Sequence, residues 1–551
     1  MHDLVPDPTD PWLRPAQTFP ALLEEMIDRI KSYGDEEAVE EDRYLFRRGD
    51  RAIDFFLMLA GEMKIFAGHP IKGEDYLFSY GRGQFSGEQN LFNDRSILFS
   101  GLAMAGSRFI RIGHDRFRSF MTGEPEIGET IIRVYILRRA GFVRHCKGGG
   151  LLIGHRDDGE LLRMQRFMLR NLYPVAVFDP ELEPDCGATL SSLGVTQTDM
   201  PVLVKPDRTV LSQLSNEALA EELGIFEPPE EGRVYDVAVL GAGPAGLAAA
   251  VYAASEGLKT IVLEAMAPGG QAGTSSKIEN YLGFPTGISG LALAGRAHIQ
   301  AQKFGARLCV SRSAVSLDCN VGPYEVGLSD ERRLNARSIV IATGARYRKL
   351  DVPDYHRFEG HGIHYAATAM EAQFCVARDI VIVGGGNSAG QAAIFLSRTA
   401  RQVHILMRGG ISSTMSDYLV QRIERSPRIS LHQQSEVTAL HGETSLEAVS
   451  WIDRSTGKSE KSPATSLFVM IGASPNTEWL NGCVALDRSG FVQTGYTVAD
   501  GADISPYAAS QPGVFAVGDV RAGSVKRVAS AVGEGSVVIS AIHQYLSALQ
   551  G

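Results

Sequence analysis

The chain has 551 residues, of which 44% are hydrophobic, and a formal net charge of −10 at pH 7. This length is enough for about three or four domains, each with its own core. The mild acidity gives no reason to expect nucleic acid or an anionic membrane as a partner. No apolar run reaches the roughly 20 residues of a membrane span, and the N-terminus lacks the apolar region of a secretory signal. We therefore expect a cytoplasmic protein.

Six cysteines are scattered along the chain, and no two of them form a C-x-x-C motif. They are Cys146, Cys186, Cys309, Cys319, Cys375 and Cys483. This usage predicts reduced thiols, and it offers neither a zinc site nor a redox-active pair. We expect no metal site.

Residues 1–145 begin with an expected helix over Phe19–Tyr33, followed by short alternating strands. The strands are expected around Tyr44–Phe46, Phe55–Leu59 and Met63–Phe66. The pattern resembles the cyclic-nucleotide-binding β-roll, in which Phe85–Ser96 would be the phosphate cassette and helix Glu126–Val143 the C-terminal lid. No helix-turn-helix follows, so a transcription factor is not expected.

The cassette carries residues suited to a cyclic nucleotide. Gly87 would admit the ligand, Glu88 would accept from the ribose 2′-OH, and Arg95, followed by Ser96, would pair with the cyclic phosphate. The segment between Leu91 and Arg95 is shorter than usual, which would truncate its small helix. Two interpretations remain open: a ligand-binding domain, and a degenerate roll used for packing.

Residues 148–226 form a smaller predicted α/β unit in the order βαβαββα. This order resembles the thioredoxin or glutaredoxin fold, and Met200-Pro201 occupies the place of that fold's cis-proline. The loop before the first helix, His155–Gly159, contains no cysteine. A docking or spacer role is therefore favoured over a redox role.

After a Pro/Glu linker at Phe226–Gly232, strand Tyr235–Leu240 runs into a glycine loop and an Ala-rich helix. In this loop Gly241 permits the turn, Gly243 lets the backbone approach a pyrophosphate, and Gly246 lets the helix pack on the strand. Pro244 and Ala245 open the helix, whose N-terminal N–H groups face the phosphates. Glu264 ends the next strand and can accept from ribose hydroxyls. The pattern predicts a bound dinucleotide.

The same device recurs after strand Asp379–Val383. Its loop and first helical turn contain Gly384, Gly386, Asn387, Ser388 and Ala389. The next strand ends near Arg408 with no acid at its tip, and an arginine there suits the 2′-phosphate of NADPH. NADPH is therefore favoured, with NADH as the alternative and a merely solvated Arg408 as the competing interpretation.

Further short motifs surround the two loops in a fixed order: Gly269–Gln271, Ile278–Tyr281, Ala342–Ala345, Gly472–Asn476 and Gly513–Val520. Together they resemble thioredoxin reductases, a homodimeric FAD- and NADPH-dependent family. The resemblance implies an FAD domain over 233–347 and 475–551, with the nicotinamide domain inserted at 348–474. The FAD residues that it implies beyond the first loop are Gly270, Gln271, Asn280, Thr343, Gly344, Gly518, Asp519, Lys526, Arg527 and Val528.

The expected fold is therefore a multidomain α/β protein with a β-roll, a small thioredoxin-like unit and two Rossmann-like, three-layer units.

One departure from the resemblance decides the chemistry. Where that family has a Cys-Ala-Thr-Cys stretch, this chain has Ala366-Ala367-Thr368-Ala369. Alanine cannot form the thiolate that relays electrons to a disulfide. The nearby Cys375 is alone and is expected to be a buried apolar residue.

Three functional hypotheses remain. The first is an NAD(P)H-dependent flavoenzyme with a non-dithiol acceptor such as a quinone, a ferredoxin-like protein or oxygen, with no side chain named as catalytic. The second is a slow or non-catalytic sensor of redox state or cyclic nucleotide. The third is a thiol reductase that uses cysteines from a partner.

Overall fold

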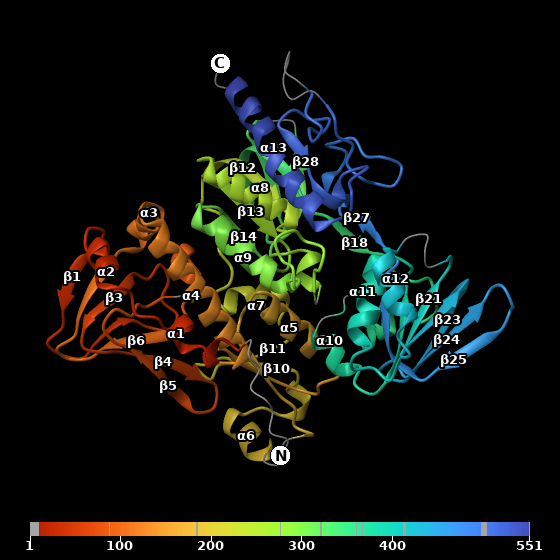
Figure 1. Ribbon diagram of the computed structural model, residues 1–551, viewed down its shortest axis with the longest axis horizontal. Coiled ribbons are helices and arrows are strands. Elements are labelled where there is room, and N and C mark those ends of the chain that lie inside the picture. Colours follow the sequence, from red (N-terminus) through yellow and green to blue (C-terminus); the bar gives the residue numbers. More distant parts are fainter. Residues whose placement is uncertain are drawn as a thin grey trace.

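The computed structural model describes most of the chain. The described residues are 10–87, 89–182, 186–275, 277–319, 322–359, 361–365, 367, 369–410, 415–496 and 504–549. Figure 1 shows the N-terminal part (red to orange) and the cyan to light-blue part on opposite sides of a central column. The column is formed by the yellow and green segments, which contain α5 (Gly159–Arg170) and β12 (Val234–Leu240).

The N-terminal part is a β-roll of two antiparallel sheets, with strand orders β1-β7-β3 and β2-β6-β4-β5. Its strands are β1 (Asp35–Ala38), β2 (Arg43–Phe46), β3 (Phe55–Ala60), β4 (Met63–His69), β5 (Gly73–Tyr80), β6 (Phe99–Ala103) and β7 (Arg108–Ile112). Helices α3 (His114–Gly123) and α4 (Pro125–Arg144) follow, so the helix expected over Glu126–Val143 is confirmed.

The single helix expected over Phe19–Tyr33 is wrong. The structure has a short α1 (Pro15–Thr18), an extended stretch and then α2 (Glu24–Ile30). Pro20 explains the break, because a proline disfavours helical backbone at the residue before it and cannot donate a hydrogen bond itself.

The small unit has the predicted order of strands and helices. It contains β8 (Gly150–Ile153), α5, β9 (Val175–Phe178), α6 (Cys186–Leu193), β10 (Val202–Val204), β11 (Val210–Ser212) and α7 (Asn216–Glu222). The sheet order is β11-β10-β8-β9, with β8 parallel to β9 and antiparallel to β10. The Met200–Pro201 peptide bond is cis.

A seven-stranded sheet contains the first glycine loop. Its order is β14-β13-β12-β17-β16-β15, with β28 (Val514–Ala516) paired to β17. The other strands are β13 (Thr260–Glu264), β14 (Arg307–Val310), β15 (Ala314–Asp318), β16 (Tyr324–Leu328) and β17 (Arg333–Ile341). Helices α8 (Pro244–Ser255) and α13 (Val528–Ala548) pack together through small side chains in one buried cluster. This sheet therefore joins two segments of the chain that are far apart in sequence.

A second sheet, in the order β19-β26-β20-β21-β22 and parallel throughout, contains the second glycine loop. Its strands are β19 (Ile363–His364), β20 (Asp379–Val383), β21 (Gln402–Met407), β22 (Ile429–Gln433) and β26 (Ala464–Val469). Helices α10 (Ala369–Phe374), α11 (Asn387–Leu396) and α12 (Asp417–Glu424) accompany it, with a three-stranded sheet of β23 (Ser435–His441), β24 (Ala448–Asp453) and β25 (Ser459–Ser462). Strands β18 (Ala345–Tyr347) and β27 (Ala473–Pro475) pair antiparallel where the chain enters and leaves this unit.

The expectation that every cysteine is reduced is wrong, because Cys319 and Cys483 form a disulfide. Their Cα atoms lie 5.9 Å apart although 164 residues separate them in sequence. Strand β15 brings Cys319 beside the short helix η7 (Glu478–Leu480), which precedes Cys483. Spacing along the chain could not reveal this pair, because disulfide geometry depends on distance in space.

Among the described residues, the structure has no helix both long and apolar enough to cross a membrane.

Candidate functional site

The first glycine loop connects β12 to α8 at the centre of the seven-stranded sheet. Gly241 has φ +107° and donates its N–H to the carbonyl of Leu263 at 2.8 Å. A Cβ atom at Gly241 would overlap the carbonyl of Ala342, and one at Gly246 would overlap the carbonyl of Gly241. These two glycines are therefore needed for the turn and for the close packing of helix on strand.

Gly243 differs from its two neighbours in the motif because it faces open space. It caps the N-terminus of α8, with Pro244 as the first helical residue, and a Cβ atom there would meet no described atom within 4 Å. A helix N-terminus with free N–H groups and no covering side chain suits a diphosphate. The loop therefore fits the pyrophosphate of a dinucleotide such as FAD.

Glu264, at the end of β13, is held at the loop by backbone donors. Its carboxylate accepts from the N–H of Ala242 at 2.8 Å and from the N–H of Met266 at 3.0 Å. A carboxylate has about four lone-pair sites, so acceptor capacity remains for ribose hydroxyls. Glu264 thus both orders the loop and presents an acceptor beside it.

The segment Gly269–Gln271 packs directly on the glycine loop. Gly269 donates its N–H to the carbonyl of Ala242 at 2.7 Å, and the position of a Cβ atom at Gly270 lies 3.0 Å from the Cα of Gly243. The Gln271 amide donates to the carbonyl of Ala345. Two predicted FAD motifs are therefore brought together at the first loop.

The returning C-terminal segment completes this end of the sheet. Thr343 Oγ1 donates to the carbonyl of Asn476 at 2.8 Å, and the Asn476 amide donates to the carbonyl of Thr343 at 2.9 Å. Gly344 has φ +63°. Gly518 donates its N–H to Glu534 at 2.7 Å, and a Cβ atom at Gly518 would lie 2.9 Å from the Cβ of Ala245. Asp519 is thereby held beside the first turn of α8.

Other predicted FAD residues lie at the surface. Asn280, Lys526 and Arg527 are exposed, and Val528 begins α13. The Lys526 ammonium lies 4.6 Å from the centre of the Phe491 ring. Burial raises the pKa of Asp519, and the nearby Lys526 partly offsets that effect. The structure thus brings Asp519 and Lys526 together.

Sequence reasoning missed two residues at this site. Arg170, at the end of α5 in the small unit, donates to the carbonyl of Gly270 at 3.0 Å. Burial raises the pKa of the Tyr347 hydroxyl, and Arg170 and Asp519 are both close enough to act on it. The Tyr347 ring stacks on Tyr365 with centroids 5.6 Å apart. Only the tertiary fold reveals these residues, because no motif contains them.

The second glycine loop repeats the first around β20 and α11. Gly384 has φ +143° and donates its N–H to the carbonyl of Leu406 at 3.0 Å, and Gly386 caps α11. Asn387 accepts from the N–H of Ser416 at 2.7 Å. Ser388 and the buried Ala389 continue the first turn, and the exposed Arg408 follows β21. The arrangement fits a second dinucleotide. Arg408 is exposed where the ribose of that dinucleotide is predicted to lie.

Helix α5 links the two nucleotide-binding units. At its C-terminal end Arg170 contacts the Gly269–Gln271 segment. One turn earlier, Arg166 lies 3.3 Å from Glu371 and 3.4 Å from the ring nitrogen of His364, both in the second unit. The small unit therefore contacts both units directly.

The predicted cyclic-nucleotide cassette is filled by protein groups. A Cβ atom at Gly87 would overlap Leu91 and the Tyr135 hydroxyl. The fully buried Arg138 of α4 donates to the carbonyl of Phe85 at 2.9 Å and to that of Gly87 at 3.2 Å. The truncated cassette helix is a single 3-10 turn, η2 (Gln89–Phe92). Glu88 lies outside the described residues.

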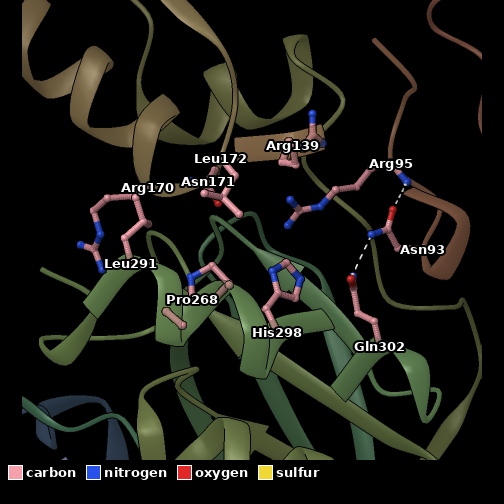
Figure 2. A pocket seen from close by; sticks show the side chains of 12 residues that line it. Asn93, Arg95, Arg139, Arg170, Asn171, Leu172, Pro268, Leu291, His298 and Gln302 are labelled. Carbon is pink, nitrogen blue, oxygen red and sulfur yellow. Dashed lines mark hydrogen bonds between the residues drawn. The ribbon is translucent and has the colours of Figure 1, made fainter. Parts of the chain in front are cut away.

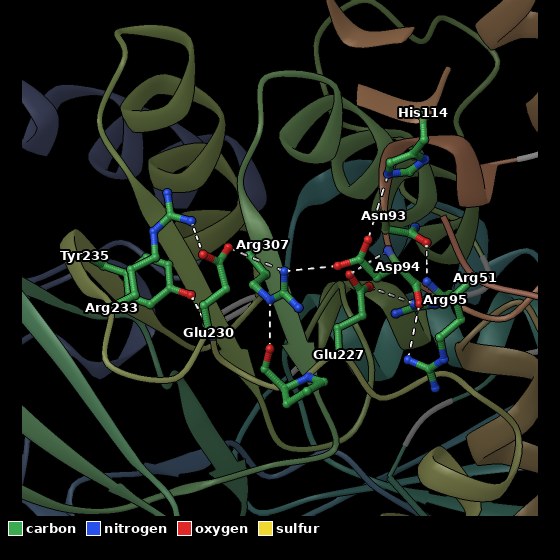
Figure 3. Close-up of polar contacts among 11 residues, drawn as sticks. Arg51, Asn93, Asp94, Arg95, His114, Glu227, Glu230, Arg233, Tyr235 and Arg307 are labelled. Atoms are coloured by element: carbon green, nitrogen blue, oxygen red, sulfur yellow. Dashed lines mark hydrogen bonds and ion pairs between the residues drawn. The ribbon is translucent and has the colours of Figure 1, made fainter. Parts of the chain in front are cut away.

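The polar groups of the cassette that were expected to hold a phosphate bond instead to other protein groups, at the linker (Figure 3) and just before it. Arg95 Nε lies 3.3 Å from Glu227, and the Asp94 N–H donates to the same carboxylate at 3.2 Å. The Ser96 N–H donates to the carbonyl of Gly224 at 3.2 Å. Both partners of the ion pair are buried, with side-chain exposures of 8% for Arg95 and 3% for Glu227.

The same loop also contacts the seven-stranded sheet unit. Asp94 pairs with Arg307 of β14 at 3.2 Å, and Arg307 also donates to the carbonyl of Pro228 at 2.8 Å. The Asn93 amide donates to Gln302 of α9 (Gly290–Lys303) at 3.1 Å. Three consecutive cassette residues therefore join the β-roll to the rest of the chain.

Comparison with known proteins identifies families that match the two glycine-loop units and the β-roll. The family profile described as pyridine nucleotide-disulphide oxidoreductase matches residues 235–535, more than half of the chain. The chain belongs to this family. A second profile, the cyclic nucleotide-binding domain, matches residues 36–124. Thioredoxin reductase-like members of the family use FAD and NADPH. Two dinucleotide cofactors account for the presence of two glycine loops.

Individual relatives agree with the profile. The chain is 34% identical to the thioredoxin reductase of Streptomyces clavuligerus over 318 residues, which are 57% of this chain and 95% of that protein. It is also 34% identical to the NADPH-dependent thioredoxin reductase 3 of Arabidopsis thaliana, over 57% of this chain and 59% of that protein. The crystal structure of Lactococcus lactis thioredoxin reductase in its FR conformation aligns with a TM-score of 0.52 at 27% identity, over 57% of this chain and 99% of that one.

In this member of the pyridine nucleotide-disulphide oxidoreductase family, the segment of residues 366–369 contains no cysteine. Ala366 and Thr368 lie outside the described residues, and the Ala367 side chain between them is buried. The nearby Cys375 is fully buried, its thiol contacts the carbonyl of Glu371 at 3.2 Å, and burial raises its pKa to about 11. A thiol with so high a pKa is not a thiolate near neutral pH, so Cys375 is no substitute for the missing pair.

Proposed function

We propose that this protein is an FAD-dependent NAD(P)H oxidoreductase that passes electrons to an acceptor other than a dithiol protein. The proposal rests on one observation: two complete dinucleotide loops surround a segment whose alanines at 366 and 369 cannot relay electrons through sulfur. Bound FAD would supply the redox chemistry, taking a hydride from the nicotinamide and giving electrons to the acceptor. The chain binds and orients the two cofactors.

The same proposal assigns a role to each unit of the chain. Residues 1–145 form the β-roll and 148–226 the small unit, while 233–347 and 475–551 bind FAD around a nicotinamide unit at 348–474. The chain is proposed to act as a cytoplasmic homodimer, by analogy with thioredoxin reductases.

The disulfide gives no support to a thiol-based route. Cys319 follows β15, which lies at the edge of the sheet and is separated from β12 by β17 and β16. The glycine loop opens from the end of β12. The disulfide is therefore remote from the loop in the order of the strands, and a structural role suits it better than electron transfer.

Anaerobic stopped-flow reduction tests the proposal. The holoprotein is mixed with NADPH or NADH, and then with oxidised thioredoxin, a quinone or oxygen. We expect fast loss of the oxidised flavin absorbance, reoxidation by a non-dithiol acceptor and no thioredoxin turnover. Cys375→Ser should leave every rate unchanged. Purified protein without flavin, or rapid thioredoxin turnover, would refute the proposal.

Regulation by a cyclic nucleotide is the second candidate function, and the profile match over residues 36–124 favours it. Any such ligand has to compete with Glu227 and Gly224 for the cassette donors. Calorimetric titration with cAMP and cGMP tests this candidate. Saturable binding, tighter in Glu227→Gln than in the wild type, would support regulation; no binding in either protein would leave the β-roll as a docking domain.

A further inference from the structure

The small unit and the seven-stranded sheet unit meet at the C-terminal end of α5. The Arg170 side chain extends from this end of the helix toward the sheet unit, where Pro268 and Leu291 lie (Figure 2). Its guanidinium donates to the carbonyl of Gly270 at 3.0 Å and lies 3.2 Å from the sulfur of Met266. Arg170 lies outside the family match at residues 235–535, whereas both of its partners lie inside it.

The charge of Arg170 is not balanced by an ion pair. A guanidinium stays protonated near neutral pH, and burial disfavours that charge. Burial lowers the pKa of Arg170, while Glu264 and the Tyr347 hydroxyl act in the opposite direction. Within the described part of the chain no carboxylate pairs directly with Arg170, whose two acceptors are a neutral carbonyl and a thioether sulfur. A guanidinium has five N–H donors, so donors remain for a ligand.

The carbonyl that Arg170 contacts belongs to the segment that packs on the first glycine loop. A Cβ atom at Gly270 would lie 3.0 Å from the Cα of Gly243. Gly243 is the residue of that loop whose Cβ position is open, and it caps the helix N-terminus that suits a diphosphate. Direct contacts therefore lead from Arg170 through Gly270 to the predicted pyrophosphate position.

The charges that act on Arg170 point to the same part of the cofactor. In FAD the pyrophosphate lies between the adenosine ribose and the flavin half. Glu264 presents an acceptor for that ribose, and it is close enough to act on Arg170. Tyr347 is close to both Arg170 and Asp519, a predicted FAD residue on the returning C-terminal segment. Arg170 thus lies among the predicted FAD residues, near the middle of the dinucleotide rather than at one end.

We propose that Arg170 of the small unit binds the pyrophosphate of FAD, so that the small unit forms one wall of the flavin site. The identity of the cofactor as FAD rests on the proposed function. A docking contact with Gly270 needs only one donor, whereas a guanidinium also supplies parallel N–H groups and a counter-charge for a phosphate. The small unit, which has no C-x-x-C motif, then retains the cofactor instead of exchanging electrons with it.

Titration of the apoprotein with FAD, followed by flavin fluorescence, tests this role. We expect Arg170→Gln to weaken FAD binding by about 10- to 100-fold, the range of one charged hydrogen bond, and Arg170→Lys to recover part of the loss. Arg163→Gln is the matched control. Arg163 lies on the same helix, but its hydrogen bonds among the described residues go to Glu160, Leu214 and Asn216 of the small unit. This variant should keep the affinity of the wild type.

Two further readouts separate a phosphate contact from a disturbed interface. Salt should weaken FAD binding more steeply in the wild type than in Arg170→Gln, because ions screen a charge pair. The ³¹P resonances of FAD bound to the holoprotein should move in Arg170→Lys and stay in place in Arg163→Gln. Equal FAD affinity in the wild type and Arg170→Gln, or unmoved ³¹P resonances in Arg170→Lys, would overturn this role of Arg170 and leave the proposed function intact. Wild-type apoprotein that binds no FAD would overturn both.

Discussion

Two loops in this chain have the composition of phosphate-binding segments, and they use their donors in opposite ways. In the Gly241–Gly246 loop, a Cβ atom at Gly243, which caps the N-terminus of α8, would meet no described atom within 4 Å. In the Phe85–Ser96 cassette, the arginine and two backbone N–H groups bond to Glu227 of the linker and to Gly224, which lies just before the linker. One loop leaves its hydrogen-bond donors available for a ligand, and the donors of the other already bond to protein acceptors.

The difference shows that residue type alone does not establish a binding site. The Arg95 guanidinium could bind a phosphate, but it already pairs with the carboxylate of Glu227. An internal partner is always present at high effective concentration, whereas a ligand must bind from solution. The following predictions test where each donor is used, from the largest expected effect to the smallest.

Removing the internal anion should be the most damaging change. Glu227→Ala leaves the buried Arg95 unpaired, and we expect it to lower the free energy of unfolding by about 3–5 kcal/mol. Chemical denaturation followed by circular dichroism measures this. Glu230→Ala, in the same linker but exposed, should cost about 1 kcal/mol or less. If the two variants were equally stable, the cassette would not depend on its internal partner.

The contact of the small unit with the nicotinamide side should appear in the pH dependence of stability. Burial is the main reason that the pKa of His364, beside Arg166 and Glu371, is lowered to about 4. The unfolded chain takes up this proton near pH 6.5, so stability is lost as the pH falls from 6.5 toward 4. From pH 7 to pH 5 the loss should be about 2 kcal/mol.

His364→Gln should remove that loss, with His543→Gln, at a half-buried histidine of α13, as the control. The measurement is the denaturation midpoint of each variant at the two pH values. An unchanged pH response in His364→Gln would show that the ring is already solvated in the folded protein.

The open loop predicts a change that harms the ligand and spares the fold. Gly243→Ala adds a methyl group where the protein has space, at backbone angles that alanine tolerates. We expect the affinity for FAD to fall by about 1–3 kcal/mol through overpacking against the pyrophosphate, with the unfolding midpoint of the apoprotein unchanged. Flavin fluorescence titration measures the first quantity. A stable variant with normal FAD affinity would place the pyrophosphate elsewhere.

The smallest effect concerns the choice of nicotinamide. Arg408 is exposed, so its attraction for a 2′-phosphate should be worth only about 1 kcal/mol, or about a fivefold preference. Arg408→Ala should therefore reduce the ratio of kcat/KM for NADPH to that for NADH by about this factor. A ratio that does not change would mean that Arg408 is a solvated surface residue.

The parts of the molecule that the sequence could predict are those governed by local chemistry. Strand, glycine loop and helix follow one another within a few residues in both dinucleotide motifs, so Gly241 and Gly384 could be assigned from spacing. The single helix expected over Phe19–Tyr33 does not form, because Pro20 disfavours helical backbone at the residue before it. The partners of Arg95 and the role of Arg170 were out of reach, because Glu227 is 132 residues from Arg95 and Gly270 is 100 residues from Arg170.

The Cys319–Cys483 disulfide has a consequence for how the chain can be cut. The bond closes a covalent ring that contains every strand of the nicotinamide-side sheet, from Ile363 to Val469. A protease that cleaves once inside this ring produces two polypeptides that still migrate as one molecule. Only a reducing agent separates them, so limited proteolysis followed by reducing and non-reducing electrophoresis distinguishes cuts between Cys319 and Cys483 from cuts elsewhere.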